Sequence, residues 1–140
     1  MPANASLWSL IGFVLWTIAV LMVGIGLPRL HAVLTRTAPP KFFRADVPHG
    51  SERYQRAMRA HLNCVENLPL FVALVLTAKA VELESTAFEA LALIVLPARM
   101  VQSTIHIASG TNWAVMLRFY FFSVQLACMI GMALVLLANL

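Results

Sequence analysis

The sequence predicts an all-α integral membrane protein, a bundle of four transmembrane helices. Only 11% of its 140 residues are charged, whereas soluble domains carry about a quarter. Hydrophobic residues make up 61% of the chain, and the mean hydropathy is +0.83. The apolar residues also gather into runs long enough to cross a hydrocarbon core of about 30 Å. A chain of this length has room for one domain, which we take as residues 1–140.

Four apolar runs, each separated from the next by polar or charged residues, define the spans. They cover residues 7–27, 59–78, 87–107 and 113–137. The first run contains no charged residue, and Pro28 follows it, so we expect the first helix to end there. Ser51 is a favourable N-cap for the second helix, and residues 86–89 match a capping box for the third. Pro69 and Pro97 lie inside the second and third helices, where we expect kinks.

The positive charge is concentrated between the first two spans. Seven of the ten Lys and Arg lie at residues 29–59, together with two acids, which gives this stretch a net charge of +5. The positive-inside rule therefore predicts a cytoplasmic connection at residues 28–58, with both termini and the acidic 79–89 connection on the other side. No nucleic-acid motif accompanies the charge, so we expect no nucleic-acid partner. The two cysteines lie in apolar runs and indicate neither a disulfide framework nor a metal site.

Polar residues recur at helical spacing within three of the four spans. These stripes are Arg59, Asn63 and Glu66; Arg99, Gln102, Ser103 and His106; and Arg118, Phe122 and Gln125. An Arg at mid-membrane costs about 2.5–3.5 kcal/mol, so we expect the charged residues to face the bundle interior or water, and the three stripes to define a wet interior path. Arg59, Arg99 and Arg118 face one membrane-embedded acid, Glu66, because Glu89 belongs to the 79–89 connection, and this cationic excess predicts an anionic ligand.

A purely structural interpretation also fits these residues. Glu66 would then neutralise Arg99 or Arg118, and His106 would be a hydrogen-bonded core histidine. The amides of Asn63, Gln102 and Gln125 would hold the helices together.

Residues 56–71, RAMRAHLNCVENLPLF, resemble the helix-two signature of the MAPEG family, the membrane-associated proteins of eicosanoid and glutathione metabolism. The family pattern is Arg-Ala-x-x-Asn-x-x-Glu followed by a proline. Here Arg59, Asn63 and Glu66 stand at the required offsets, with Pro69 behind them. Chain length and four spans agree with the family, of which this chain resembles a bacterial-type member.

The resemblance implies a homotrimer that binds glutathione between neighbouring subunits at the cytoplasmic membrane boundary. Arg118 would correspond to the catalytic arginine that holds the glutathione thiolate. The binding residues implied by the resemblance are Arg29, Arg59, His61, Asn63, Glu66, Asn67, Arg99, Gln102 and His106. The protein would be a multi-pass protein of the inner or plasma membrane.

The function implied is transfer of the glutathione thiolate to a lipophilic electrophile from the bilayer, or reduction of a hydroperoxide, as in detoxification. His106 stands where active relatives often carry a Tyr, and Phe119 and Phe122 replace hydroxyl residues. A non-catalytic member that binds lipids or small molecules is therefore an alternative. Another is a small four-span transporter, although its usual acid on the first helix is missing here.

Overall fold

The computed structural model describes residues 4–44 and 47–140, which form four long helical segments joined by short connections. The first segment contains α1 (Ala5–Leu21), a π-helical turn (Met22–Gly26) and α2 (Leu27–Leu34). The others are α3 (Glu52–Ala80), α4 (Thr86–Ala108) and α5 (Asn112–Leu137). All four segments are long and apolar enough to cross a membrane.

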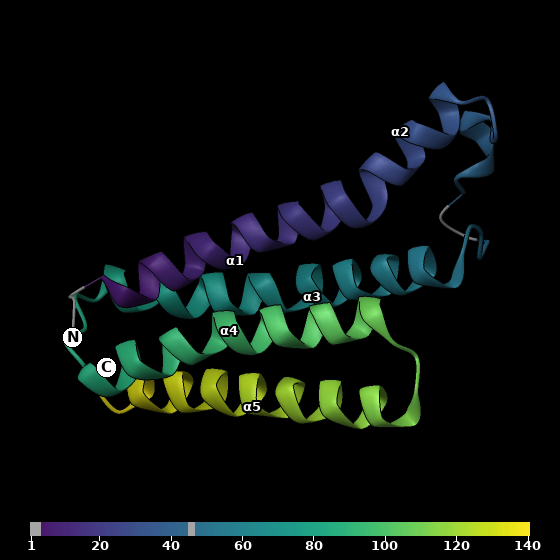
Figure 1. Ribbon diagram of the computed structural model, residues 1–140. Coiled ribbons are helices and arrows are strands. Elements are labelled where there is room, and N and C mark those ends of the chain that lie inside the picture. Colours follow the sequence, from purple (N-terminus) through teal and green to yellow (C-terminus); the bar gives the residue numbers. More distant parts are fainter. Residues whose placement is uncertain (1–3, 45–46) are drawn as a thin grey trace.

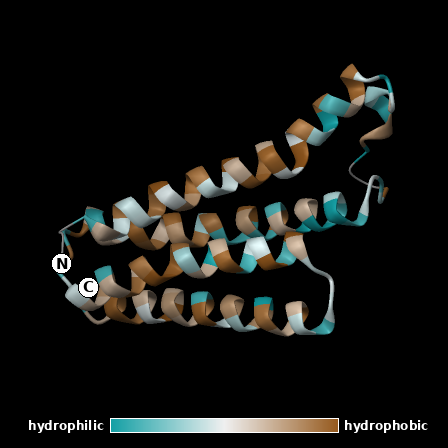
Figure 2. Ribbon diagram, viewed as in Figure 1, coloured by the Kyte–Doolittle hydropathy of each residue, from teal (hydrophilic) through white to brown (hydrophobic). Residues whose placement is uncertain are grey.

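The helices lie side by side as a bundle (Figure 1). Hydrogen bonds join Ser6 to Glu89 and Ser9 to Ala92, so α1 and α4 run in the same direction, while α3 and α5 run the opposite way. The start of α1 and the end of α5 lie at one end of the bundle, which we call the termini end (Figure 1). The other end carries α2 and the connection to α3, and we call it the loop end. Hydrophilic residues gather there, whereas the bundle itself is mostly hydrophobic (Figure 2).

Side-chain caps begin the last three long helices. The hydroxyl of Ser51 accepts a 3.2 Å hydrogen bond from the backbone N–H of Tyr54, which confirms the predicted start of α3. The capping box predicted at residues 86–89 is wrong by one residue. The N-cap of α4 is Ser85, whose hydroxyl accepts from the Phe88 N–H. Glu89 does not reach back to its own helix start because its carboxylate is bonded to Ser6 on α1.

The first helix does not end at Pro28, contrary to the sequence-based expectation. It continues to Leu34 through the π-helical turn, in which the Leu27 N–H bonds to the carbonyl of Met22, five residues back. A proline clashes with the carbonyl four residues before it in a regular helix, and a π turn widens the backbone at that point. Residues 28–34, expected in the connection, are therefore helical. Helices α3 and α4 continue through Pro69 and Pro97, the two positions at which the sequence predicts kinks.

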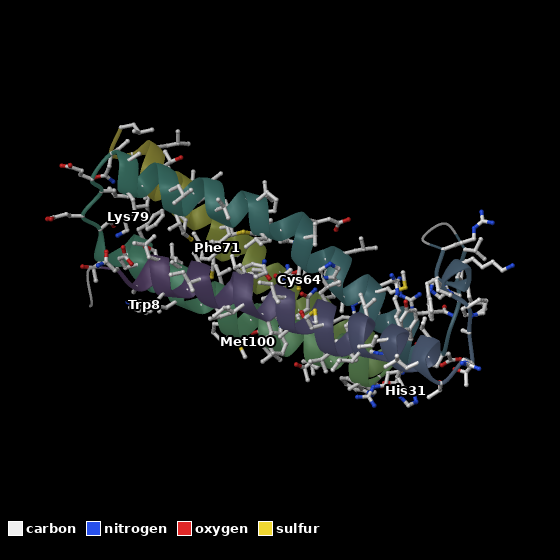
Figure 3. The ribbon with its side chains drawn as sticks, turned by 90° about the horizontal axis from the view of Figure 1, so that it is seen from above. Trp8, His31, Cys64, Phe71, Lys79 and Met100 are labelled. Atoms are coloured by element: carbon white, nitrogen blue, oxygen red, sulfur yellow. The ribbon has the colours of Figure 1, made fainter. Side chains whose placement is uncertain are left out.

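The apolar core extends from the termini end to the middle of the bundle. Its largest fully buried apolar side chains are Phe13, Phe71, Phe88, Met132, Val75 and Val95. Figure 3 shows Cys64 and Phe71 between the helices, with Trp8 and Lys79 at one end and His31 at the other. Cys64 and Cys128 are both free and buried. Because lipid tails are as apolar as this core, close van der Waals packing stabilises it more than exclusion of water does.

Candidate functional site

The polar stripe of α4 faces the bundle interior, as predicted. Arg99 is fully buried, and Gln102, Ser103 and His106 are each at most 5% exposed. Nη1 of Arg99 donates to Oε1 of Gln102, and the guanidinium carbon lies 5.5 Å from the ring centre of Phe13. Its Nε and Nη2 find no acceptor among the described residues. A guanidinium in this position is costly without a counter-charge, so its spare donors favour an anionic partner.

The stripe of α3 faces the other way, and the prediction that it lines the interior path is wrong. Arg59 and Glu66 are exposed on the single chain, and Asn63 is half-buried. The face of α3 that packs into the bundle instead carries mostly small or apolar residues. These are Ala57, Ala60, Cys64, Asn67 and Phe71. Small side chains let helices approach closely, which decides the face that is buried.

The end of α4 lies beside the first turns of α3. Nε of Arg56 donates to the carbonyl of Ile107 at 3.2 Å, and Sγ of Cys64 lies 3.5 Å from the hydroxyl of Ser103. These two contacts fix the antiparallel register, so Arg59, which lies between them on α3, is level with the last turns of α4.

Cationic groups from two helices surround His106 near the loop end. Arg56 and Arg59 of α3 and Arg118 of α5 all lie within electrostatic range of the His106 ring. Arg118 is half-buried. The fold thus brings the catalytic candidate Arg118 close to the predicted binding residues Arg59 and His106.

Glu66 is the acid of the α3 stripe, on the same exposed face of the helix as Arg59. It lies within electrostatic range of Arg99. No ion pair within 4.0 Å joins Glu66 to an arginine in the described part of the chain. Arg59, Arg99 and Arg118 are therefore not neutralised by close pairing with it, and the cationic excess inferred from the sequence is present in three dimensions.

Arg29, also a predicted binding residue, lies in a separate cluster at the loop end. Its Nε donates to the hydroxyl of Tyr54, and its guanidinium carbon lies 5.5 Å from the centre of the Phe43 ring. His49 packs against Tyr54 and places its Nε2 3.3 Å from the same hydroxyl. Within the single chain, Arg29 therefore contacts both the connection that follows α2 and the start of α3, and holds the two together.

The remaining predicted residues lie on inner faces of α3. Asn67 is buried and donates from Nδ2 to the carbonyl of Asn63 at 2.8 Å, which engages that donor within its own helix. His61 is half-buried, and its Nδ1 has no partner among the described residues.

Two interior residues near the site were not predicted as site residues. Gln125 is fully buried, and neither of its amide atoms has a partner in the described ranges. The seven-residue spacing between Arg118 and Gln125, which puts both on one helix face, was the sequence signal that could have identified Gln125. Phe13, which supports the Arg99 guanidinium, lies in an uncharged run that carries no such signal.

The described residues contain no group of three or more His, Cys, Asp or Glu side chains placed to hold a metal ion. The candidate site is instead a cationic surface formed by three helices. It consists of Arg59 on α3, Arg99 and His106 on α4, and Arg118 on α5. Its chemistry is that of binding an anion through charged hydrogen bonds.

Comparison with known families agrees with this picture. The model of the MAPEG family matches residues 6–138, nearly the whole chain. No curated protein and no solved structure matches the chain. Together with the four spans, the family match makes this an integral, multi-pass membrane protein with a function related broadly to glutathione or eicosanoid metabolism. The resemblance seen in residues 56–71 is thereby confirmed, and the chain belongs to the MAPEG family.

Proposed function

We propose that the cationic surface binds glutathione and activates its thiol. Glutathione carries two carboxylates and one ammonium group, and its thiolate adds a third negative charge. Arg59, Arg99 and Arg118 match the three negative groups in number, and Glu66 suits the ammonium group. The observation that carries this proposal is the uncompensated charge of Arg99, whose Nε and Nη2 lack acceptors among the described residues.

A neighbouring copy of the chain completes the site in this proposal. Glu66 lies at the middle of α3, on the face turned away from its own bundle. A carboxylate facing lipid at that depth is strongly disfavoured, whereas a subunit interface or a water-filled site accepts it. A homotrimer, the assembly implied by the family resemblance, would cover this face. The basic loop end would then lie in the cytoplasm, where glutathione would enter.

Arg118 has the catalytic role in this proposal. The thiol of a free cysteine has a pKa of about 8.5, and the thiolate is the nucleophile. Lowering the pKa of the glutathione thiol by two units requires about 2.7 kcal/mol of preferential stabilisation of the thiolate. A charged hydrogen bond contributes about 1.5–3 kcal/mol, so one guanidinium in contact with the sulfur suffices. At neutral pH the thiolate would then be the major form.

The second substrate would be a lipophilic molecule that reaches the site from the bilayer. In conjugation, the thiolate forms a carbon–sulfur bond and the leaving group departs with the electron pair of the broken bond. In hydroperoxide reduction, the thiolate attacks the terminal peroxide oxygen, the O–O bond breaks, and the alkoxide leaves and takes up a proton to give the alcohol. The oxygen stays on sulfur as glutathione sulfenic acid, which a second glutathione attacks to form the disulfide and release water.

Ultraviolet titration of the purified protein with glutathione tests this proposal. We expect thiolate absorbance to appear in the wild type and to be lost in Arg118→Ala. Lys41→Ala, which removes an exposed cation of the same loop end, is the matched control and should retain the signal. Binding without thiolate would overturn the enzymatic assignment and favour a non-catalytic binding protein. Absence of binding at millimolar glutathione would overturn both the enzymatic assignment and the assignment as a glutathione-binding protein.

A further inference from the structure

A cavity opens at the loop end, between the end of the first helical segment, the start of α3 and the end of α4. Its volume is about 520 Å³, within the usual range for small-molecule sites of about 300–1,000 Å³. The walls are mainly apolar, and most of the polar side chains come from the start of α3. The apolar lining includes Trp16, Ala19, Val20, Val23, Ala57 and Ile107.

This cavity is separate from the proposed glutathione site. Ala57 forms part of its wall, whereas Glu66 lies about two and a half helical turns further along α3 and so points to the opposite side. On α4, Thr104 lines the cavity, while His106, about 200° further round the helix, belongs to the cationic surface. Each helix thus presents one face to each site.

The shape of the cavity suits an extended apolar chain. Its wall on the first segment runs from Trp16 to Pro28, a length of about 18 Å at the usual helical rise. Trp16 lies at the far end of this wall, so its indole can report on a chain bound in the cavity.

The rim of the cavity suits a negative headgroup. Arg53 and Ser51 line it at the N-terminus of α3, where the helix dipole is positive. Arg53 is exposed, and no hydrogen bond or ion pair engages it within residues 4–44 and 47–140. An apolar interior below an unpaired arginine matches a molecule with an acyl chain and an anionic end.

We propose that this cavity binds an acyl chain of an anionic lipid from the adjacent leaflet, with the carboxylate or phosphate of the lipid at Arg53. The site is independent of glutathione. It would hold the lipid chain along the cavity walls formed by the first helical segment, the start of α3 and the end of α4.

Quenching of Trp16 fluorescence by lipids with brominated chains tests this proposal. The full chain is reconstituted as Trp8→Phe/Trp113→Phe, which removes two exposed indoles and leaves Trp16 as the reporter. Brominated anionic phospholipid, brominated zwitterionic phospholipid and brominated fatty acid are compared in the same bilayer. We expect the anionic lipids to quench Trp16 with an association constant about fivefold above that of the zwitterionic lipid, the effect of one arginine near the membrane surface. The two anionic probes distinguish a phosphate headgroup from a free carboxylate.

Two substitutions with matched controls separate the cavity from the general membrane surface. Arg53→Gln should remove the preference for anionic lipid, whereas Lys41→Gln, an exposed cation elsewhere in the loop, should retain it. Ala19→Phe should fill the cavity and remove the quenching, whereas Ala73→Phe on the outer face of α3 should not. Equal quenching by anionic and zwitterionic lipid in the otherwise unsubstituted reporter would overturn the proposal. Quenching that survives Ala19→Phe, or inaccessibility of Trp16 to every lipid because a second copy covers the cavity, would overturn it as well.

Discussion

The carboxylate of Glu89 on α4 accepts hydrogen bonds from both the backbone N–H and the hydroxyl of Ser6 on α1. The same carboxylate accepts a 3.0 Å hydrogen bond from Nζ of Lys79 on α3. Backbone donors in the first turn of a helix have no partner within the helix, so Glu89 caps α1 from a different helix. One buried acid thereby joins three helices at the termini end.

Replacing Glu89 should therefore destabilise the fold without touching the cationic surface. We expect Glu89→Ala to lower the free energy of unfolding by about 1–3 kcal/mol, because the Ser6 donors lose their acceptor. Thermal unfolding in detergent measures the effect. Glu84→Ala removes an exposed acid from the preceding connection and is the control. Equal midpoints for the two variants would contradict the capping role.

The π-helical turn packs directly against α3, which gives a prediction for Gly24. A Cβ at Gly24 would lie 3.0 Å from the Cβ of Ala57, which cannot move aside because it is attached to the backbone. We expect Gly24→Ala to cost about 1–3 kcal/mol through overpacking. At Gly26 the nearest atom would be 3.5 Å away, an ordinary contact, so Gly26→Ala should be neutral or stabilising. The two unfolding midpoints test this, and an equal change in both variants would contradict it.

The buried pair Arg99 and Gln102 should affect ligand binding more than stability. Replacing both members of a buried polar pair by apolar side chains of similar size is often neutral or stabilising. We expect Arg99→Met/Gln102→Leu to keep the unfolding midpoint but to weaken glutathione binding at least about tenfold, the effect of one lost charged hydrogen bond. Calorimetric titration and thermal unfolding of the same sample test both parts. Unchanged affinity would show that Arg99 serves the fold alone.

The outward stripe of α3 leads to a prediction about assembly. We expect native mass spectrometry from mild detergent to give the mass of three chains. Glu66→Ala should lower the affinity for glutathione about tenfold, because the ammonium group of the ligand loses its counter-charge. Glu84→Ala is again the control, with unchanged affinity. A stable single chain with unaltered glutathione binding would contradict a site completed by a neighbour.

Local patterns in the sequence were enough to find most helix boundaries. Ser51 caps α3 as expected because N-capping depends on a side chain and the backbone N–H three residues later, both within one short segment. Ser85 was missed in favour of Thr86 because both residues suit the position, and the carboxylate that would have marked the capping box is bonded to another helix. Pro28 predicted an end to the first helix, and the π-helical turn accommodates it instead.

The sequence by itself determined the membrane character, the four spans and the family signature, because hydropathy and motif spacing are properties of the chain alone. Helical spacing also showed that Arg59 and Glu66 share one face. Only the tertiary structure decided that this face turns away from the bundle, while the stripe of α4 with Arg99 turns inward. Periodicity groups residues on a helix but gives no direction in space. The direction follows from which neighbouring helices fit against Ala57, Ala60 and Cys64.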